Sequence, residues 1–184
     1  MSASQKPDIS VQRSELLLWS GIGFTLIAIA FNFWMMGVPV LFLNAGLVIS
    51  LIVWSRSESK FSQRVITLFM VAFVLMLAHL WEEYHFGFFE VLPGLFGRSA
   101  WPSGQFLRFN SIWLFLFILS IVGAQRGFRF AQLILWFFLL LGCIGNGVLH
   151  LGLTIRQGSY FPGAVSSAAL FVLGLIILRN IRTL

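Results

Sequence analysis

The amino-acid sequence predicts an all-α fold, a polytopic membrane helix bundle with about six transmembrane helices. Of the 184 residues, 59% are hydrophobic and only 10% are charged, whereas a soluble domain carries about 25% charged residues. The hydrophobic residues also form continuous runs that approach the ~20 residues a helix needs to cross a bilayer. A transmembrane β-barrel would instead show segments of alternating polarity, so the continuous runs favour helices.

The first three apolar runs follow one another with short connections. A polar tail, residues 1–14, precedes the first expected span at 15–34. The second span, 39–54, opens on Pro39, which suits a first helical turn because that position needs no backbone N–H. A polar loop then leads to the third span at 65–84.

The last three spans follow a long connection, residues 86–109, which contains prolines and glycines and is rich in aromatic residues. We expect this connection to be a loop that lies at the membrane interface or over the bundle. The fourth, fifth and sixth spans are expected at residues 110–124, 130–153 and 163–178. The fourth is short, so an extension at its N-terminal end is left open. Since no internal repeat divides the chain, residues 15–184 are expected to form a single transmembrane domain.

An even number of spans puts both termini on the same side of the membrane, and the basic residues indicate which side. The tails and the loops after the second and fourth spans carry nine of them: Lys6, Arg13, Arg56, Lys60, Arg64, Arg126, Arg129, Arg179 and Arg182. The opposite side carries three: Arg98, Arg108 and Arg156. Because cytoplasmic loops are enriched in lysine and arginine, both termini are expected in the cytoplasm. These dispersed charges are expected to contact membrane lipids, with no nucleic acid as a partner.

Ionisable residues gather at the outer end of the third span. His79, Glu82 and Glu83 lie at positions i, i+3 and i+4, so all three can share one face of a helix. Such residues are costly at membrane depth and mark candidate functional sites. This stretch is therefore the first candidate for a site.

The predicted topology brings further polar residues to the same depth. The fifth span also runs outward, and near its end Asn146 and His150 lie four residues apart on one face. Asn110 begins the fourth span on the outer side, and Tyr160 lies in the outer turn before the sixth span. We interpret Asn110, Asn146 and Tyr160 as supporting residues of a shared site.

Three interpretations fit this cluster. In the first, His79, His150 and one or both of Glu82 and Glu83 hold a divalent metal, zinc or iron, because two histidines and a carboxylate form a known catalytic ligand set. The favoured ligands are His79, Glu83 and His150, with Glu82 as a further ligand or a general base. In the second, the adjacent carboxylates Glu82 and Glu83 perform acid–base chemistry without a metal. In the third, the cluster is a structural network that locks the spans together. The single cysteine, Cys143, excludes a metal site built from several cysteines.

The stretch His79–Glu83, with the sequence His-Leu-Trp-Glu-Glu, resembles the signature of the HXXEE family of integral membrane proteins. The stretch Asn146–His150 is similar to that family's Asn-x-x-x-His element, and Tyr160–Gly163 is similar to its Pro-Gly element. The resemblance covers about residues 65–178. It implies that His79, Glu82, Glu83, Asn146 and His150 belong to the family's shared polar set. It implies no reaction, because the family has no settled biochemical activity.

The favoured function is a membrane-embedded, metal-dependent enzyme of hydrolase type, with Glu82 and Glu83 as its catalytic carboxylates. A bound metal activates water, so hydrolysis is the simplest use of such a site. The outer connection is expected to lie at the interface or over the bundle, so it leaves little room for a bulky polar substrate, which favours a lipid or another hydrophobic one. The alternatives are a non-enzymatic carrier or binding protein for a metal ion or small hydrophobic ligand, and a structural membrane subunit.

Overall fold

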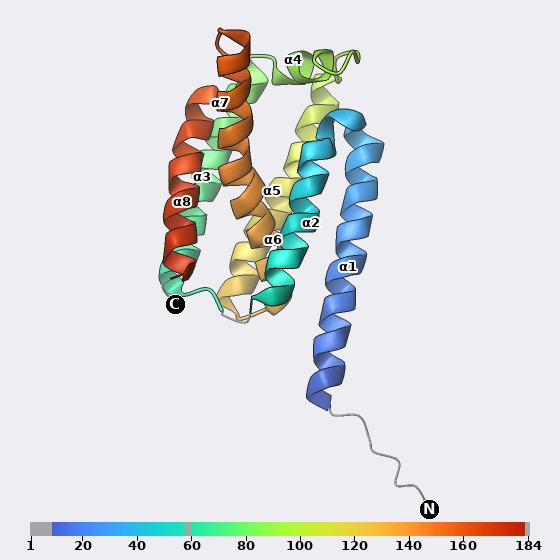
Figure 1. Cartoon of the computed structure of the whole chain (residues 1–184), viewed down its shortest axis with the longest axis vertical. Helices are drawn as coiled ribbons and strands as arrows, with labels where there is room; N and C mark the ends of the chain where they lie inside the picture. The colour runs from blue at the N-terminus through green and yellow to red at the C-terminus, as the bar shows by residue number, and fades with distance from the viewer. Residues whose placement is uncertain (1–8, 58–59, 183–184) are drawn as a thin grey trace, which may run out of the picture.

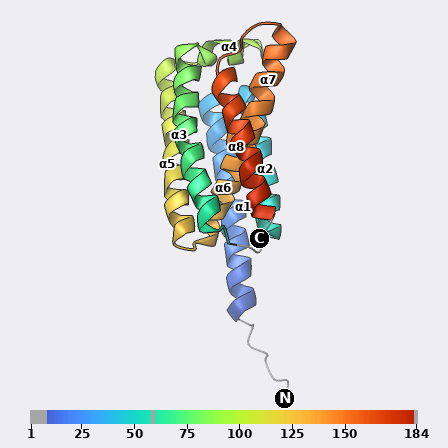
Figure 2. The same ribbon diagram turned by 90° about the vertical axis from the view of Figure 1, so that its left-hand side faces the viewer.

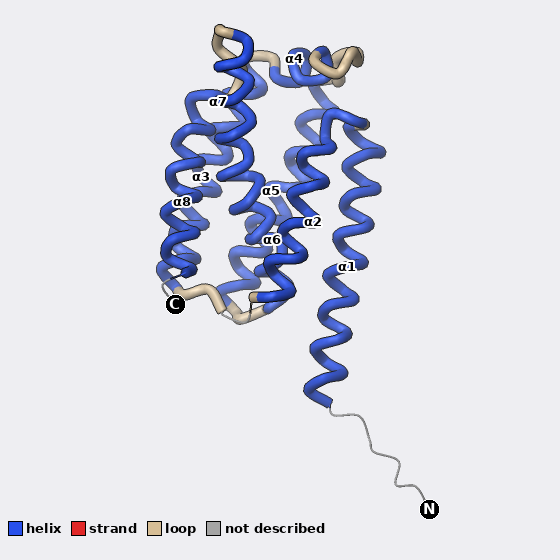
Figure 3. The backbone as a smooth tube through the Cα atoms, in the orientation of Figure 1, coloured by secondary structure: helices blue, strands red, loops and turns tan. Residues whose placement is uncertain are grey.

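The computed structural model describes residues 9–57 and 60–182 of the chain, which form a bundle of helices (Figure 1). No strand occurs among these residues (Figure 3). Six helical stretches of the described chain are long and apolar enough to cross a membrane, which confirms the predicted fold class. Five of the spans contain one α-helix each: α1 (Ile9–Met36), α2 (Leu41–Arg56), α3 (Gln63–His85), α5 (Ser103–Gln125) and α8 (Ala164–Arg182). The fifth span along the chain contains both α6 (Arg129–Phe137) and α7 (Asn146–Gln157).

The first helix begins earlier than the apolar pattern predicts. α1 starts at Ile9 rather than at residue 15, so part of the expected polar tail is helical, and residues 1–8 lie outside the described residues. The second span opens with a single 3₁₀ turn, η1 (Val38–Val40), before α2. Pro39 lies in this turn, where a missing backbone N–H costs no hydrogen bond.

The connection between the third and fourth spans is not only a loop, so the prediction for residues 86–109 was wrong on this point. It contains the short helix α4 (Phe88–Gly94), which lies across one end of the bundle (Figure 1). α5 begins at Ser103 rather than at residue 110, because Pro102 precedes the helix and its carbonyl accepts the first backbone N–H groups. The prolines and glycines that predicted a loop mark helix ends here: Pro93 lies in the last turn of α4.

The fifth span changes its winding midway. Between α6 and α7 the chain forms a π-helix, η2 (Phe138–Gly145), a rare conformation that is often found at functional sites. α7 begins directly after it at Asn146, so Asn146 and His150 lie one α-helical turn apart. The uniformly apolar sequence of η2 gave no sign of this change.

Glycines let α8 lie close to the second half of the fifth span. A Cβ added to Gly147 would lie 2.4 Å from Cβ of Phe171 on α8, and one added to Gly174 would lie 3.0 Å from Cβ of Cys143. α8 also packs along α3, as Figure 2 shows. One helix thus contacts both the element that carries His79 and the element that carries His150.

We expect Gly147→Ala to lower the free energy of unfolding by about 2 kcal/mol, because the new methyl group must displace Phe171. SDS-induced unfolding in mixed micelles measures this. Gly152→Ala is the matched control on the same helix, since nothing lies within 4 Å of a Cβ added there. Equal stability of the two variants would contradict the close packing of α7 on α8.

The polar end of α3 lies opposite the chain ends. The start of α1 and the end of α8 lie at one end of the bundle, and α4 lies at the other (Figure 1). Because the chain begins and ends at the same end of the bundle, it crosses the bundle an even number of times. The cytoplasmic placement of the termini stays a prediction.

Candidate metal centre

Three side chains with metal-binding groups are buried together at the α4 end of the bundle. Nε2 of His79 lies 3.3 Å from Oε1 of Glu83, one helical turn further along α3. Nε2 of His150, on α7, lies 3.2 Å from the same oxygen. One possible ligand atom from each residue lies within 4.8 Å of the other two. Their exposed fractions are 0%, 5% and 0% for His79, Glu83 and His150, so bulk water does not separate them.

His150 is held in one orientation and one tautomer. Its Nδ1 lies 2.6 Å from the carbonyl oxygen of Pro162, and a carbonyl oxygen only accepts, so Nδ1 carries the proton. Phe88 stacks on the ring at 5.2 Å between centroids, and Phe161 contacts it edge-on at 5.5 Å. Nε2 has no hydrogen-bond partner among the described residues. In a neutral imidazole this nitrogen carries the lone pair.

His79 is oriented in the same way by α8. The hydroxyl of Ser166 donates to the carboxylate of Glu82, so its oxygen accepts from Nδ1 of His79, at 2.9 Å. The amide nitrogen of Asn146 lies 3.2 Å from Nε2 of His79. Nε2 is therefore the lone-pair nitrogen here too. The Asn146 amide donates to that lone pair, and Oε1 of Glu83 lies 3.3 Å from the same nitrogen.

Three acceptor atoms thus converge: two imidazole Nε2 atoms and one carboxylate oxygen. Their close approach is unfavourable unless a proton or a cation lies among them. Two histidines and one carboxylate, with each Nδ1 donating to an oxygen, is an arrangement typical of zinc and non-haem iron sites. The donor set of His79, Glu83 and His150 therefore fits a divalent metal.

Glu82 lies beside this cluster but faces α8. Its Oε1 accepts from the Tyr160 hydroxyl at 2.5 Å and from the backbone N–H of Val165 at 3.1 Å. Its Oε2 accepts from the backbone N–H of Ser166 at 2.8 Å and from the Ser166 hydroxyl. The first N–H groups of a helix lack acceptors within the helix. Glu82, on α3, accepts from two of these groups at the start of α8. The carboxylate also lies at the positive end of the helix dipole.

Tyr160 and Gly163 shape the turn that covers the site. Partial burial of Tyr160, followed by the hydrogen bond to Glu82 and the charge of that carboxylate, raises the pKa of the tyrosine to about 12. The phenol therefore remains a neutral donor over the working pH range. Gly163 has a φ of +88°, and a Cβ there would lie 2.7 Å from Cε1 of His150 and 2.9 Å from Cε1 of His79. The backbone of the turn thus packs directly on both imidazoles.

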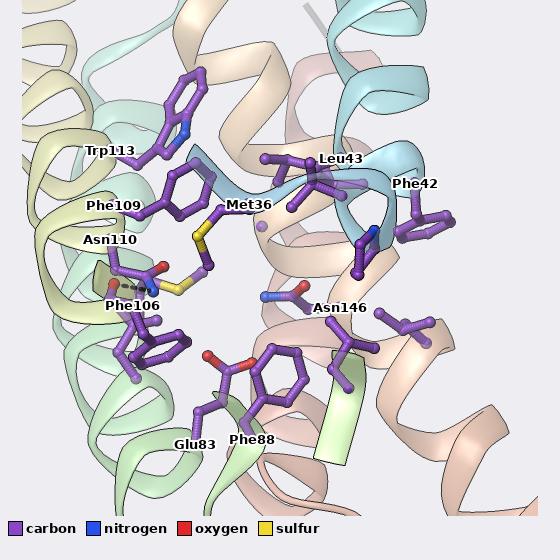
Figure 4. A pocket seen from close by; sticks show the side chains of 18 of the residues that line it. Met36, Phe42, Leu43, Glu83, Phe88, Phe106, Phe109, Asn110, Trp113 and Asn146 are labelled. Atoms are coloured by element: carbon purple, nitrogen blue, oxygen red, sulfur yellow. Dashed lines mark hydrogen bonds between the residues drawn. The ribbon is translucent and has the colours of Figure 1, made fainter. Parts of the chain in front are cut away.

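A cavity of about 120 Å³ lies in the bundle interior and reaches Glu83. Figure 4 shows the side chains of Glu83, Asn110 and Asn146 pointing into it from α3, α5 and α7. The rest of its wall is apolar and rich in aromatic rings, supplied by the α1–α2 turn and by α3, α4, α5, α6, η2 and α7. Asn110 borders the cavity and makes no contact with the histidines among the described hydrogen bonds; its Nδ2 donates to the carbonyl oxygen of Phe106 at 3.0 Å.

The structure brings most of the predicted site residues together but divides them into two sets. His79, Glu83, His150 and Asn146 share one cluster, while Glu82 and Tyr160 share the hydrogen-bonded set at the start of α8. Sequence reasoning missed Ser166, which joins the two sets by contacting both His79 and Glu82. The available signal was its position in the small-residue stretch just after the Pro-Gly turn.

Comparison with known proteins does not identify this site. No protein-family model matches the chain, and no curated protein or solved structure matches it. The resemblance of residues 79–83 to the HXXEE signature stays a prediction.

Proposed function

We propose that this protein is a membrane-embedded, metal-dependent enzyme of hydrolase type that acts on a lipid or another hydrophobic substrate near the outer face. The convergence of three acceptor atoms, from His79, Glu83 and His150, carries this proposal. Zinc and iron both accept such ligands. A metal bound there supplies a Lewis acid and a water of lowered pKa.

The residues of the chain divide the remaining work. His79, Glu83 and His150 hold the metal, and Ser166 and the Pro162 carbonyl keep both imidazoles in the ligating tautomer. The Asn146 amide has to leave Nε2 of His79 before that nitrogen binds a metal, because the nitrogen has a single lone pair. Glu83 also faces the apolar cavity, so a substrate chain in the cavity lies beside a ligand of the metal.

We assign Glu82 a positioning role in place of the catalytic role that its sequence context suggested. Both of its oxygens already accept two hydrogen bonds each. A carboxylate occupied in this way has little capacity left to take a proton from water. Glu83 is then the carboxylate that lies at the reacting end of the cavity.

We further propose that the chain is related to the HXXEE family and that both termini lie in the cytoplasm. The arrangement of residues 79–83, 146–150 and 160–163 around one site supports the first proposal, because the resembling stretches meet in space. The excess of basic residues at the end that carries the termini supports the second.

Metal content of the detergent-purified protein, measured by inductively coupled plasma mass spectrometry, tests the site. We expect close to one zinc or iron per chain in the wild type, and loss of that metal in the His79→Ala, His150→Ala double variant. His85→Ala is the matched control, because His85 is exposed and stacks on Trp81 outside the cluster. Retention of metal in the double variant would refute the site.

Hydrolysis is tested separately, with a mixture of lipid esters and amides in proteoliposomes. We expect turnover by the wild type and by His85→Ala, and none by Glu83→Gln. Turnover that survives Glu83→Gln would refute the proposed role of this carboxylate.

One observation favours a second candidate, a binding protein that holds a metal without turnover. Both histidines are fully buried, and only Glu83 of the three ligands lines the cavity. A metal in such a site is well shielded from water. Stoichiometric metal with no hydrolysis of any lipid class would favour this candidate over the enzyme.

A further inference from the structure

The polar groups that face the cavity are not evenly divided between donors and acceptors. The indole N–H of Trp113 donates to Oδ1 of Asn32 at 3.2 Å, and that of Trp101 donates to the carbonyl of Met36 at 3.1 Å. Both indoles line the cavity, yet their N–H groups are already used within the protein. A ligand in the cavity therefore finds no free indole donor.

Asn110 presents the opposite character. Its Nδ2 donates to the Phe106 carbonyl, four residues earlier on α5. The amide cannot be reversed without placing its oxygen against that carbonyl oxygen, so the assigned orientation is the favourable one. Figure 4 shows the oxygen of Asn110 directed into the cavity, opposite Asn146 and above Glu83. Oδ1 of Asn110 is thus an acceptor at the wall of a space that is apolar apart from Asn110, Glu83 and Asn146.

The dimensions and lining of the cavity limit its occupant. Its volume is about 120 Å³, and a cavity of about 150 Å³ in another protein holds one benzene molecule. The space therefore takes a head group and the first carbons of one chain, not two acyl chains. The flexible side chains of Met36 and Met76 border it, and methionine adapts to ligands of varied shape.

We propose that this cavity binds a single-chain amphiphile whose head carries a neutral O–H or N–H donor, and that Asn110 is the residue that selects it. The ligand's donor binds Oδ1 of Asn110, and its chain lies among Phe106, Phe109 and Trp113. Neutrality of the head rests on the proposed function, because a divalent metal with one carboxylate ligand leaves a net positive charge that repels a cation. Long-chain alcohols and primary amides have this chemistry.

The test uses the full-length protein in nanodiscs and counts bound ligand by native mass spectrometry. The probes are decanol, decanamide, methyl decanoate and decyltrimethylammonium. We expect the alcohol and the amide to bind about tenfold more tightly than the ester, which has no donor, since one hydrogen bond in an apolar site contributes about 1.4 kcal/mol. Measurements on the wild type are enough to overturn the proposal: methyl decanoate would bind as tightly as the alcohol and the amide, or decyltrimethylammonium would bind more tightly than they do.

Asn110→Leu is expected to remove the preference for a donor while leaving the ester's affinity unchanged. Asn180→Leu is the matched control, because Nδ2 of Asn180 makes the same contact with the carbonyl four residues earlier, at 2.8 Å, far from the cavity. Persistence of the preference in Asn110→Leu would remove Asn110 from the proposal.

Each probe is measured with the protein stripped of metal and after zinc is added. If the protein binds no metal but still prefers probes with a donor, and loses this preference in Asn110→Leu, the proposed function is refuted and the proposed class of ligand stands. Metal binding with no donor preference would refute only the ligand class.

Discussion

Replacing Gly163 with alanine is expected to lower the free energy of unfolding by about 3 kcal/mol and to abolish metal binding. At a φ of +88°, an L side chain is strained by about 1–2 kcal/mol. The new Cβ would also lie 2.7 Å and 2.9 Å from the Cε1 atoms of His150 and His79, and overpacking of this kind costs about 1–3 kcal/mol. The imidazoles must rotate or separate to admit the methyl group.

Gly158→Ala separates strain from contact with the histidines. Gly158 also has a positive φ, +64°, but nothing lies within 4 Å of a Cβ built there. It should therefore show the strain alone, with metal content unchanged. SDS-induced unfolding and metal analysis of both variants decide the matter. If the two variants match in stability and metal content, the turn does not pack on the histidines.

The depth of the site was predictable from the sequence, and its contacts were not. Apolar runs and basic residues gave six spans, and six spans put His79, Asn146 and His150 at one end. Depth alone does not determine which helix faces point at one another. The two histidines meet at Glu83 because α8 packs closely against the helices that carry them. Glycines permit this close packing, and the sequence does not show which side chain lies against each glycine.

The contacts of the two carboxylates could not be predicted for the same reason. Glu82 and Glu83 are adjacent in sequence, so each is an equally good ligand or base on paper. On a helix, adjacent side chains point about 100° apart, and here one faces the histidines while the other faces the start of α8. Ser166, which gives Glu82 two of its hydrogen bonds, lies 84 residues further along the chain, and a serine after a turn is not a specific signal.

The winding of the fifth span was also beyond sequence reasoning. η2 is a continuous apolar run whose residues suit an α-helix equally well. A Cβ added to Gly142 would lie 2.7 Å from Cδ2 of Phe138, and one added to Gly145 would lie 3.1 Å from Cδ1 of Leu141. A larger residue at either position would compete with these side chains and with Met76 of α3 or Phe42 of α2.

Glu82→Gln is expected to destabilise the protein by about 2–4 kcal/mol and to weaken metal binding by about 10–100-fold. Each oxygen of Glu82 accepts one backbone N–H and one hydroxyl: Val165 and Tyr160 at Oε1, Ser166 at Oε2. Either orientation of the glutamine amide therefore places its NH₂ group against a backbone donor. The loss of charge at the start of α8 adds to this cost.

The effect on metal binding follows from Ser166. Without a carboxylate to accept its proton, the Ser166 hydroxyl is free to rotate and to donate to Nδ1 of His79 in place of accepting from it. His79 is then no longer held in the tautomer that leaves Nε2 unprotonated for the metal. Glu90→Gln is the control for the change of charge, because Glu90 is exposed on α4, and it should alter stability by less than about 0.5 kcal/mol.

Tyr160→Phe distinguishes positioning from catalysis at Glu82. It removes one of the two donors to Oε1 and leaves both backbone N–H groups paired, so the cost should be about 1 kcal/mol with metal content unchanged. If Glu82 instead acted as the catalytic base, Glu82→Gln would abolish turnover while stability and metal affinity stayed at wild-type values. That result would restore the catalytic role to Glu82 and remove the structural one.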